Sequence, residues 1–129
     1  MSVLFFSTDT QGAGEQLQRE IETFIPGVEI EINHTFESFS NRLRQPSWNL
    51  SVFVLMVGTR EDLQELFLIR DLFNNIPVIL VIPDSESDTI CAGHKLYPRF
   101  LSYIDSNYLD VAMVLNKLIN KEVKKQWQN

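Results

Sequence analysis

Cysteine is nearly absent from this chain of 129 residues, which contains only Cys91. A single cysteine cannot form a disulfide within the chain, and it excludes every metal site that needs several thiolates. This usage fits a reducing compartment, so we expect a cytoplasmic protein. Glycine and proline are also few, with five of each, and no repeat or low-complexity segment interrupts the chain. These features predict one compact domain with a substantial core.

Long apolar runs and an excess of positive charge are missing as well. No window approaches the roughly 18 apolar residues of a membrane span. The first residues lack a basic region and their apolar run is short, which favours a strand over a signal peptide. The formal net charge is −6. We therefore expect neither a nucleic acid nor a membrane as a partner.

Acidic residues are missing from the middle of the chain, where none lies between Glu37 and Glu61. This gap contains residues 51–57, an uncharged run of mostly β-branched, aromatic and other apolar residues that Gly58 ends. A run of this length and composition predicts a strand that is buried on both faces. Such strands lie inside parallel sheets, and the residues at their carboxyl ends usually determine function.

Apolar runs alternate with segments of helical spacing along the whole chain. Charged and apolar residues alternate within residues 28–32, which indicates a strand at a sheet edge. The helix that follows Thr59 is expected to continue to Asn74 and Asn75, and the last helix is expected to bury Leu109. Strands are predicted at residues 3–6, 28–32, 50–57, 77–82 and 99–104, each followed by a helix.

Five strand–helix units in succession predict an α/β fold. Strands that alternate with helices form a parallel sheet with right-handed crossovers and helices on both faces. For a doubly wound (βα)5 domain of this size, the expected strand order is 2-1-3-4-5, as in flavodoxin-like folds.

In length, element order and element size, the whole chain resembles the receiver domains of two-component response regulators. The resemblance implies a receiver-like domain over residues 1–125 and a C-terminal tail at 126–129. Working receivers hold Mg²⁺ with an acidic pair after the first strand, and they phosphorylate an aspartate that ends the third strand. A Thr or Ser ends the fourth strand and a Lys ends the fifth. This chemistry needs a carboxylate nucleophile, oxygen ligands for the metal and a cation for the phosphoryl oxygens.

Each of these receiver features is missing or displaced in this chain. The acidic pair should follow the first strand, but Ser7 and Thr8 stand there and Asp9 comes late. Residues 54–57 offer no acceptor, and residues 102–104 offer no lysine. The chain therefore looks like a pseudo-receiver, a bacterial signalling domain that has no enzymatic activity, cofactor or metal. Its expected partner is another signalling protein or a second copy of the chain.

Aromatic residues gather near the fifth strand. Receivers commonly bind partners through the fourth helix, fifth strand and fifth helix, and aromatic side chains are enriched at such interfaces. The alternative is that Phe100 and Tyr108 simply belong to the core. The candidate interface residues are Tyr97, Phe100, Tyr103, Tyr108 and, in the lysine-rich C-terminal segment, Trp127.

A second resemblance concerns the polar loop at residues 7–14. Flavodoxins bind the flavin phosphate with a loop of this kind, and a helix N-terminus attracts anions. The alternative function is therefore a protein that binds FMN or a phosphate ligand, although the loop also suits simple capping of the next helix. The candidate ligand residues are Ser7, Thr8, Asp9, Thr10 and Gly12, together with Thr59 and Asp84 from neighbouring loops.

Overall fold

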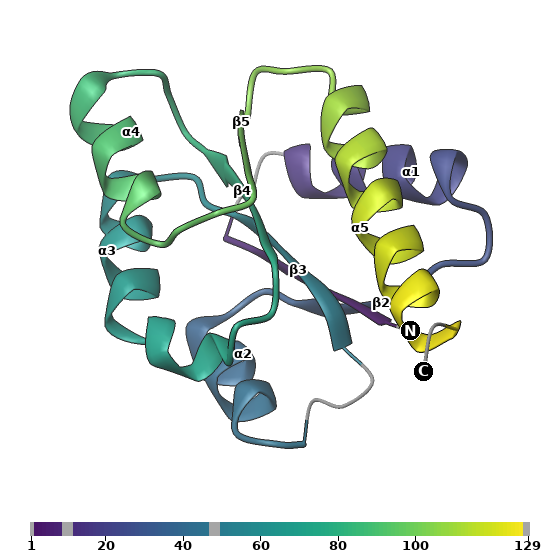
Figure 1. Ribbon diagram of the computed structural model, residues 1–129. Coiled ribbons are helices and arrows are strands. Elements are labelled where there is room, and N and C mark those ends of the chain that lie inside the picture. Colours follow the sequence, from purple (N-terminus) through teal and green to yellow (C-terminus); the bar gives the residue numbers. More distant parts are fainter. Residues whose placement is uncertain (1, 9–11, 47–49, 128–129) are drawn as a thin grey trace.

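The computed structural model describes residues 2–8, 12–46 and 50–127, with side chains described as far as residue 121. Five parallel strands form one sheet in the order β2-β1-β3-β4-β5, and helices cover both faces (Figure 1). This arrangement is the flavodoxin-like fold, so the predicted architecture and strand order are confirmed. The elements are β1 (Ser2–Ser7), α1 (Ala13–Phe24), β2 (Glu29–Asn33), α2 (Phe36–Leu43), β3 (Leu50–Met56), α3 (Arg60–Leu68), the 3-10 helix η1 (Arg70–Phe73), β4 (Val78–Ile82), α4 (Ser87–His94), β5 (Phe100–Tyr103) and α5 (Leu109–Trp127).

The three central strands β1, β3 and β4 are buried along their whole length. Successive residues of a strand point to opposite faces of the sheet, so each strand supplies two cores. Val54 and Met56 pack on the face covered by α1 and α5 (Figure 1). Phe53 and Leu55 pack on the other face, beneath α2, α3 and α4. The uncharged runs thus predicted two-sided burial correctly.

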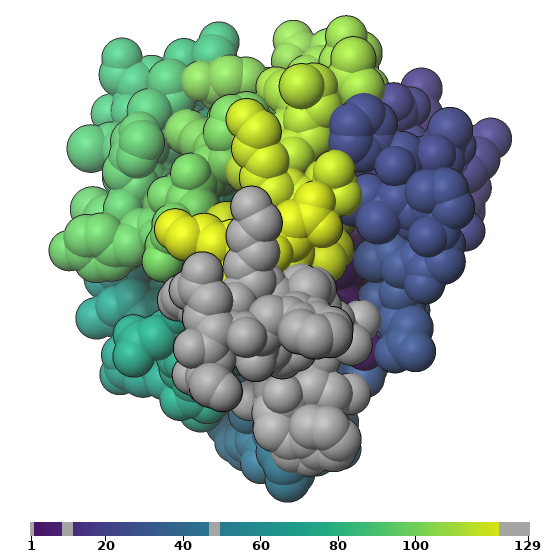
Figure 2. Space-filling model, turned by 45° about the vertical axis from the view of Figure 1, so that its right-hand side comes forward, coloured from purple at the N-terminus to yellow at the C-terminus, as the bar shows by residue number. Residues whose placement is uncertain are grey.

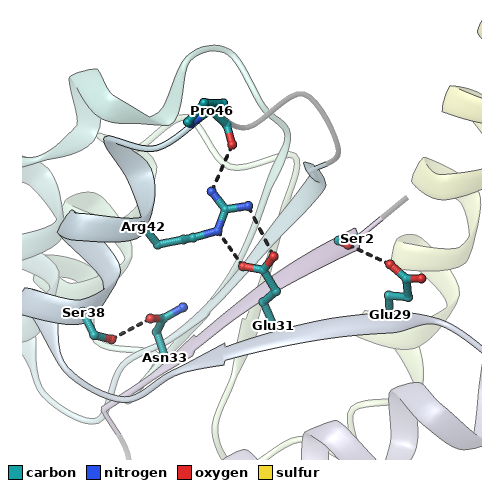
Figure 3. Close-up of polar contacts among 7 residues, drawn as sticks. All are labelled: Ser2, Glu29, Glu31, Asn33, Ser38, Arg42 and Pro46. Atoms are coloured by element: carbon teal, nitrogen blue, oxygen red, sulfur yellow. Dashed lines mark hydrogen bonds and ion pairs between the residues drawn. The ribbon is translucent and has the colours of Figure 1, made fainter.

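The edge strand β2 is held to the domain by side-chain hydrogen bonds (Figure 3). The guanidinium of Arg42 on α2 binds the carboxylate of Glu31 through two nitrogens, with N–O distances of 2.6 and 3.3 Å. The hydroxyl of Ser2 donates to Glu29 at 3.1 Å. Charged side chains on an exposed edge oppose pairing with a foreign strand. The edge position predicted from the charge alternation is confirmed.

The helix expected to continue to Asn74 is interrupted. α3 ends at Leu68, and the chain tightens into η1 after Ile69, whose amide bonds the Leu66 carbonyl at 3.1 Å. Arg70 explains part of this break. Its guanidinium donates a hydrogen bond to the Phe67 carbonyl oxygen at 2.7 Å and lies over the Phe67 ring. Because the Phe67 carbonyl accepts this side-chain hydrogen bond, it does not need a backbone amide of a continuing helix as its partner.

The start of α5 also differs from the prediction. Leu109, expected to face inward, is 43% exposed, whereas Tyr108 is only 2% exposed. Tyr108 adopts a left-handed backbone, with φ at 65°, and its hydroxyl donates to the Ile104 carbonyl. Asn107 then accepts the Leu109 amide at 3.1 Å, so α5 starts with Leu109 turned outward. Within the described residues, no helix has the length and apolar character that crossing a membrane requires.

Candidate functional site

The carboxyl edge of the sheet is the place where this fold usually holds its ligand. Here Ser7 at the end of β1 lies opposite Met56 at the end of β3. Met56 is fully buried and Ser7 is 2% exposed. The end of the central strand therefore presents an apolar thioether to the core and no carboxylate to solvent.

Thr8 connects the end of β1 to the loop after β3. Its amide donates to the Met56 carbonyl at 3.1 Å, and its hydroxyl accepts the Gly58 amide at 3.1 Å. The same hydroxyl donates to the carboxylate of Asp62 at 2.7 Å. Both hydrogen-bonding functions of the Thr8 side chain are thus satisfied within the protein.

Thr59 and Asp62 stabilise the start of α3. The Thr59 hydroxyl accepts the amide of Asp62 at 3.2 Å, which is the N-cap arrangement. The Asp62 carboxylate lies in the first helical turn, where the positive end of the helix dipole favours an anion. Together with Thr8, these residues join the end of β1 to the start of α3.

Arg60 organises a second group of polar side chains, between the starts of α3 and α4. Its Nε donates to the Thr89 hydroxyl at 3.1 Å, and Nη2 lies 2.7 Å from a carboxylate oxygen of Glu86. Asp88 is more distant, at 4.0 Å from Nη1. Thr89 is fully buried, so its hydroxyl holds Arg60 from the protein interior, whereas the ion pair of Arg60 with Glu86 is exposed.

Asp84 belongs to this second group. A hydrogen bond from the Thr89 side chain, the Glu86 amide and the positive charge of Arg60 hold the pKa of Asp84 below its usual value. The Glu86 amide donates to Asp84 at 3.0 Å. Hydrogen bonds to a carboxylate favour its ionised form. The Asp84 carboxylate therefore stabilises the loop that precedes α4.

A cavity of about 290 Å³ lies beside the start of α1. Ser7, Gly12 and His34 are among its lining residues, and the carboxylate-bearing Glu15 lines it as well. Gly14 allows α1 to approach β1 closely, because a Cβ there would lie 2.8 Å from the Ser7 oxygen. This cavity is the nearest feature to the phosphate loop that the sequence predicted. Asp9 and Thr10, the centre of that loop, lie outside the described residues.

The five candidate ligand residues that the structure describes make separate contacts. Ser7 and Gly12 line the cavity beside α1, Thr8 bonds Asp62, Thr59 caps α3, and Asp84 bonds the α4 loop. Across residues 2–8, 12–46 and 50–121, no three His, Cys, Asp or Glu side chains are grouped so as to hold a metal ion. The sequence reasoning missed Arg60 and Thr89, because nothing local indicates their contact across 29 positions.

The candidate interface residues occupy different environments. Tyr97 is 87% exposed, and Phe100 and Tyr103 on the edge strand β5 are half-buried. Tyr108 is a core residue, so it does not reach the surface as an interface residue must. The side chain of Trp127 lies outside the described residues.

Two apolar residues of α5 are also exposed, although the sequence did not single them out as surface residues. Leu109 and Met113 are 43% and 45% exposed and lie one helical turn apart. Figure 2 shows the described part of α5, in yellow, between α1, in blue, and green residues of the α4–β5 part of the chain. Ala112 and Leu115, on the inner side of α5, are both buried.

Two comparisons of the sequence with known proteins find no match. No protein-family model matches the sequence, and a search of curated proteins finds no significant match. The resemblance to receiver domains therefore rests on the length of the chain and on the order and size of its elements, whereas the residues at its strand ends depart from the receiver pattern.

Proposed function

We propose that this chain is a receiver-like signalling domain that does not accept a phosphoryl group and that acts by binding another protein. The observation that carries this proposal is the pairing of buried Met56 with Ser7 at the carboxyl edge. Phosphoryl transfer at this position would need a carboxylate nucleophile next to oxygen ligands for Mg²⁺. The thioether of Met56 is neither a carboxylate nucleophile nor an oxygen ligand.

The neighbouring polar groups support the same proposal. The Thr8 hydroxyl is engaged by Gly58 and Asp62, and Arg60 is engaged by Glu86 and Thr89. A phosphoryl site must keep its metal ligands and its cation available for the transferred group. Here the polar groups hold the loops to each other, which is a structural use. We infer that the domain is not an enzyme and uses no cofactor.

The proposed binding surface is the face formed by α4, β5 and α5. Its exposed or half-buried apolar residues include Phe100, Tyr103, Leu109 and Met113. Leu109 and Met113 lie one helical turn apart on α5, and exposed apolar side chains grouped in this way are typical of protein interfaces. The partner we propose is another signalling protein or a second copy of this chain. The resemblance to receivers also leads us to propose a bacterial, cytoplasmic protein.

The experiment that tests the interaction compares two charge substitutions in a capture assay. Wild-type protein is used to capture partners from the lysate of its native host, in parallel with Met113→Lys and Gln16→Lys. Both positions are exposed, but Gln16 lies on α1. We expect Met113→Lys to lose a partner that Gln16→Lys retains, since a charge in an apolar interface is costly. Equal capture by all three proteins contradicts the proposed surface.

A phosphate-ligand function has one observation in its favour, the cavity of about 290 Å³ beside Ser7 and Gly12. The first turn of α1 would supply amide donors for an anion there. Glu15 lines the same cavity and would repel a phosphate, so this function ranks second. Titration with FMN tests it, because tight binding quenches flavin fluorescence. Quenching that Gly12→Val abolishes would favour this second function over the first.

A further inference from the structure

A groove of about 410 Å³ opens at the amino end of β4 and β5, the opposite edge of the sheet from Thr8. It lies between η1 and the segment that joins α4 to β5. Its floor is apolar, since Phe73, Val78 and Leu96 line it and are 6%, 4% and 5% exposed. None of these residues belongs to the carboxyl-edge groups described above.

Positive charge dominates the rim of this groove. Arg70, Lys95 and Arg99 line it, against a single carboxylate from Asp71. The whole chain has a net charge of −6, so this cationic rim stands out from an acidic surface. Lys95 and Arg99 are exposed, and neither forms an ion pair or a side-chain hydrogen bond with any residue the structure describes. Their charges are therefore available to a ligand.

Two residues that line the groove, Asn75 and Tyr97, have a left-handed backbone, and Asn74 beside them is the C-cap of η1. Asn74, Asn75 and Tyr97 have φ angles of 54°, 63° and 51°, and the other described non-glycine residue with positive φ is Tyr108. A left-handed backbone is sterically unfavourable at a residue such as tyrosine. Such conformations cluster at binding sites, where the surrounding structure fixes them. The amide of Arg99 bonds the Val78 carbonyl at 2.8 Å, which anchors the Lys95 side of the rim to the sheet.

Tyr97 adds an aromatic surface to this cationic rim. Its side chain is 87% exposed, the highest exposure among the large hydrophobic residues of the described chain. A tyrosine that is turned to solvent at a strained position contributes nothing to the core. A ring beside two cations suits a ligand that carries both apolar groups and negative charges.

We propose that this groove binds an acidic, extended segment of a partner protein. Carboxylates of the segment pair with Lys95 and Arg99, and an apolar side chain packs between Tyr97 and the floor at Leu96. The proposal rests on the proposed function, since it names the chemistry of a partner for the same interaction domain. A nucleic acid suits the groove less well, because an extended polyanion would also meet the acidic surface around it.

The test is a binding titration with synthetic peptides. A fluorescein-labelled peptide of glutamates interrupted by leucines is titrated with the full chain, and a second peptide carries glutamine in place of every glutamate. We expect the acidic peptide to bind and to shift the amide resonances of Asn75, Lys95 and Tyr97. Raising the salt concentration should weaken binding, because the contacts are charged and exposed. The glutamine peptide should bind at least about tenfold more weakly.

Charge-neutral variants locate the site. Lys95→Gln combined with Arg99→Gln should weaken acidic-peptide binding by about tenfold or more. The matched control combines Lys117→Gln with Arg44→Gln, two exposed cations away from the groove, and should keep wild-type affinity. All four residues are exposed, so the folds should survive; circular dichroism spectra check this.

Three outcomes would overturn the groove proposal. They are equal binding by the two double variants, equal binding of the two peptides, and tighter binding of a short DNA duplex than of the acidic peptide. If the acidic peptide does not bind while Met113→Lys still loses the captured partner, the groove proposal is wrong and the proposed function stands. If the acidic peptide binds at the groove and the captured partner is equally retained by Met113→Lys, the proposed surface is wrong and the groove stands.

Discussion

The hydroxyl of Thr8 donates a hydrogen bond to the Asp62 carboxylate at 2.7 Å, across 54 positions of the sequence. This bond joins the end of β1 to the first turn of α3. It occupies the edge of the sheet where the receiver resemblance implies a metal-bound phosphoryl group. Polar side chains at this edge thus hold the fold together.

Thr8→Val should lower the free energy of unfolding by about 1–2 kcal/mol, since it leaves the Gly58 amide and the Asp62 carboxylate without this partner. Urea denaturation measures the change. Thr8→Ser keeps the hydroxyl and should lose less than Thr8→Val. Ser85→Ala, at an exposed position, should stay within about 0.5 kcal/mol of wild type. A Thr8→Val protein as stable as the Ser85→Ala protein would contradict the role given to this hydroxyl.

Met56→Asp should destabilise the protein by about 3 kcal/mol or more, because it places an uncompensated carboxyl in a fully buried position. Burial should raise the pKa of the new carboxyl above its unfolded value. The stability of this variant should then fall as the pH rises, since the unfolded chain releases the proton first. Met56→Leu should cost less than about 1.5 kcal/mol. Thermal unfolding at several pH values makes the comparison, and a stable Met56→Asp protein would show that this strand end can accommodate an acceptor.

The ion pair between Arg42 and Glu31 should contribute about 0.5–1 kcal/mol, more than a typical exposed pair, because it is bidentate and its side chains are 15% and 38% exposed. A double-mutant cycle with Arg42→Ala and Glu31→Ala measures the coupling. The pair of Arg60 and Asp88, 4.0 Å apart with side chains 37% and 87% exposed, provides the comparison. Its coupling should be close to zero. Equal couplings would mean that β2 is not held by the contact in Figure 3.

The pKa of Asp84 should lie below the usual value for aspartate, chiefly because of the hydrogen bond from Thr89. A carboxyl whose folded pKa is lowered stabilises the fold above its unfolded pKa and loses that contribution as the pH falls through its folded pKa. Carbon-detected NMR titration of the Asp84 carboxyl follows this directly. Thr89→Val should raise the pKa, whereas Thr89→Ser should keep it low. An unchanged titration in Thr89→Val would assign the shift to the Glu86 amide and Arg60 instead.

The sheet could be predicted from the sequence because its signals are local. Uncharged runs such as residues 51–57 indicate burial on both faces, and the alternating charges of residues 28–32 indicate an edge. The lack of a carboxylate at the end of β3 also follows from the sequence, since no acidic residue lies between Glu37 and Glu61. The break in the helix after Leu68 could not be predicted, because it depends on the hydrogen bond from the Arg70 side chain to the Phe67 carbonyl.

The polar groups and the groove could not be predicted, since each joins segments that are distant in sequence. Arg60 reaches Glu86 across 26 positions, and the groove brings Arg70 together with Lys95 and Arg99. Helical spacing also placed Leu109 inside, because it could not reveal that Tyr108 takes the buried position through a left-handed turn.

The central claim is that the carboxyl edge of this sheet carries no phosphoryl-accepting site. The most direct measurement incubates the protein with acetyl phosphate and Mg²⁺ and records its intact mass, with a phosphorylatable receiver as the positive control. We predict an unchanged mass for this chain under conditions that fully modify the control. A stoichiometric phosphoryl adduct that is lost at alkaline pH, as an acyl phosphate is, would contradict the account.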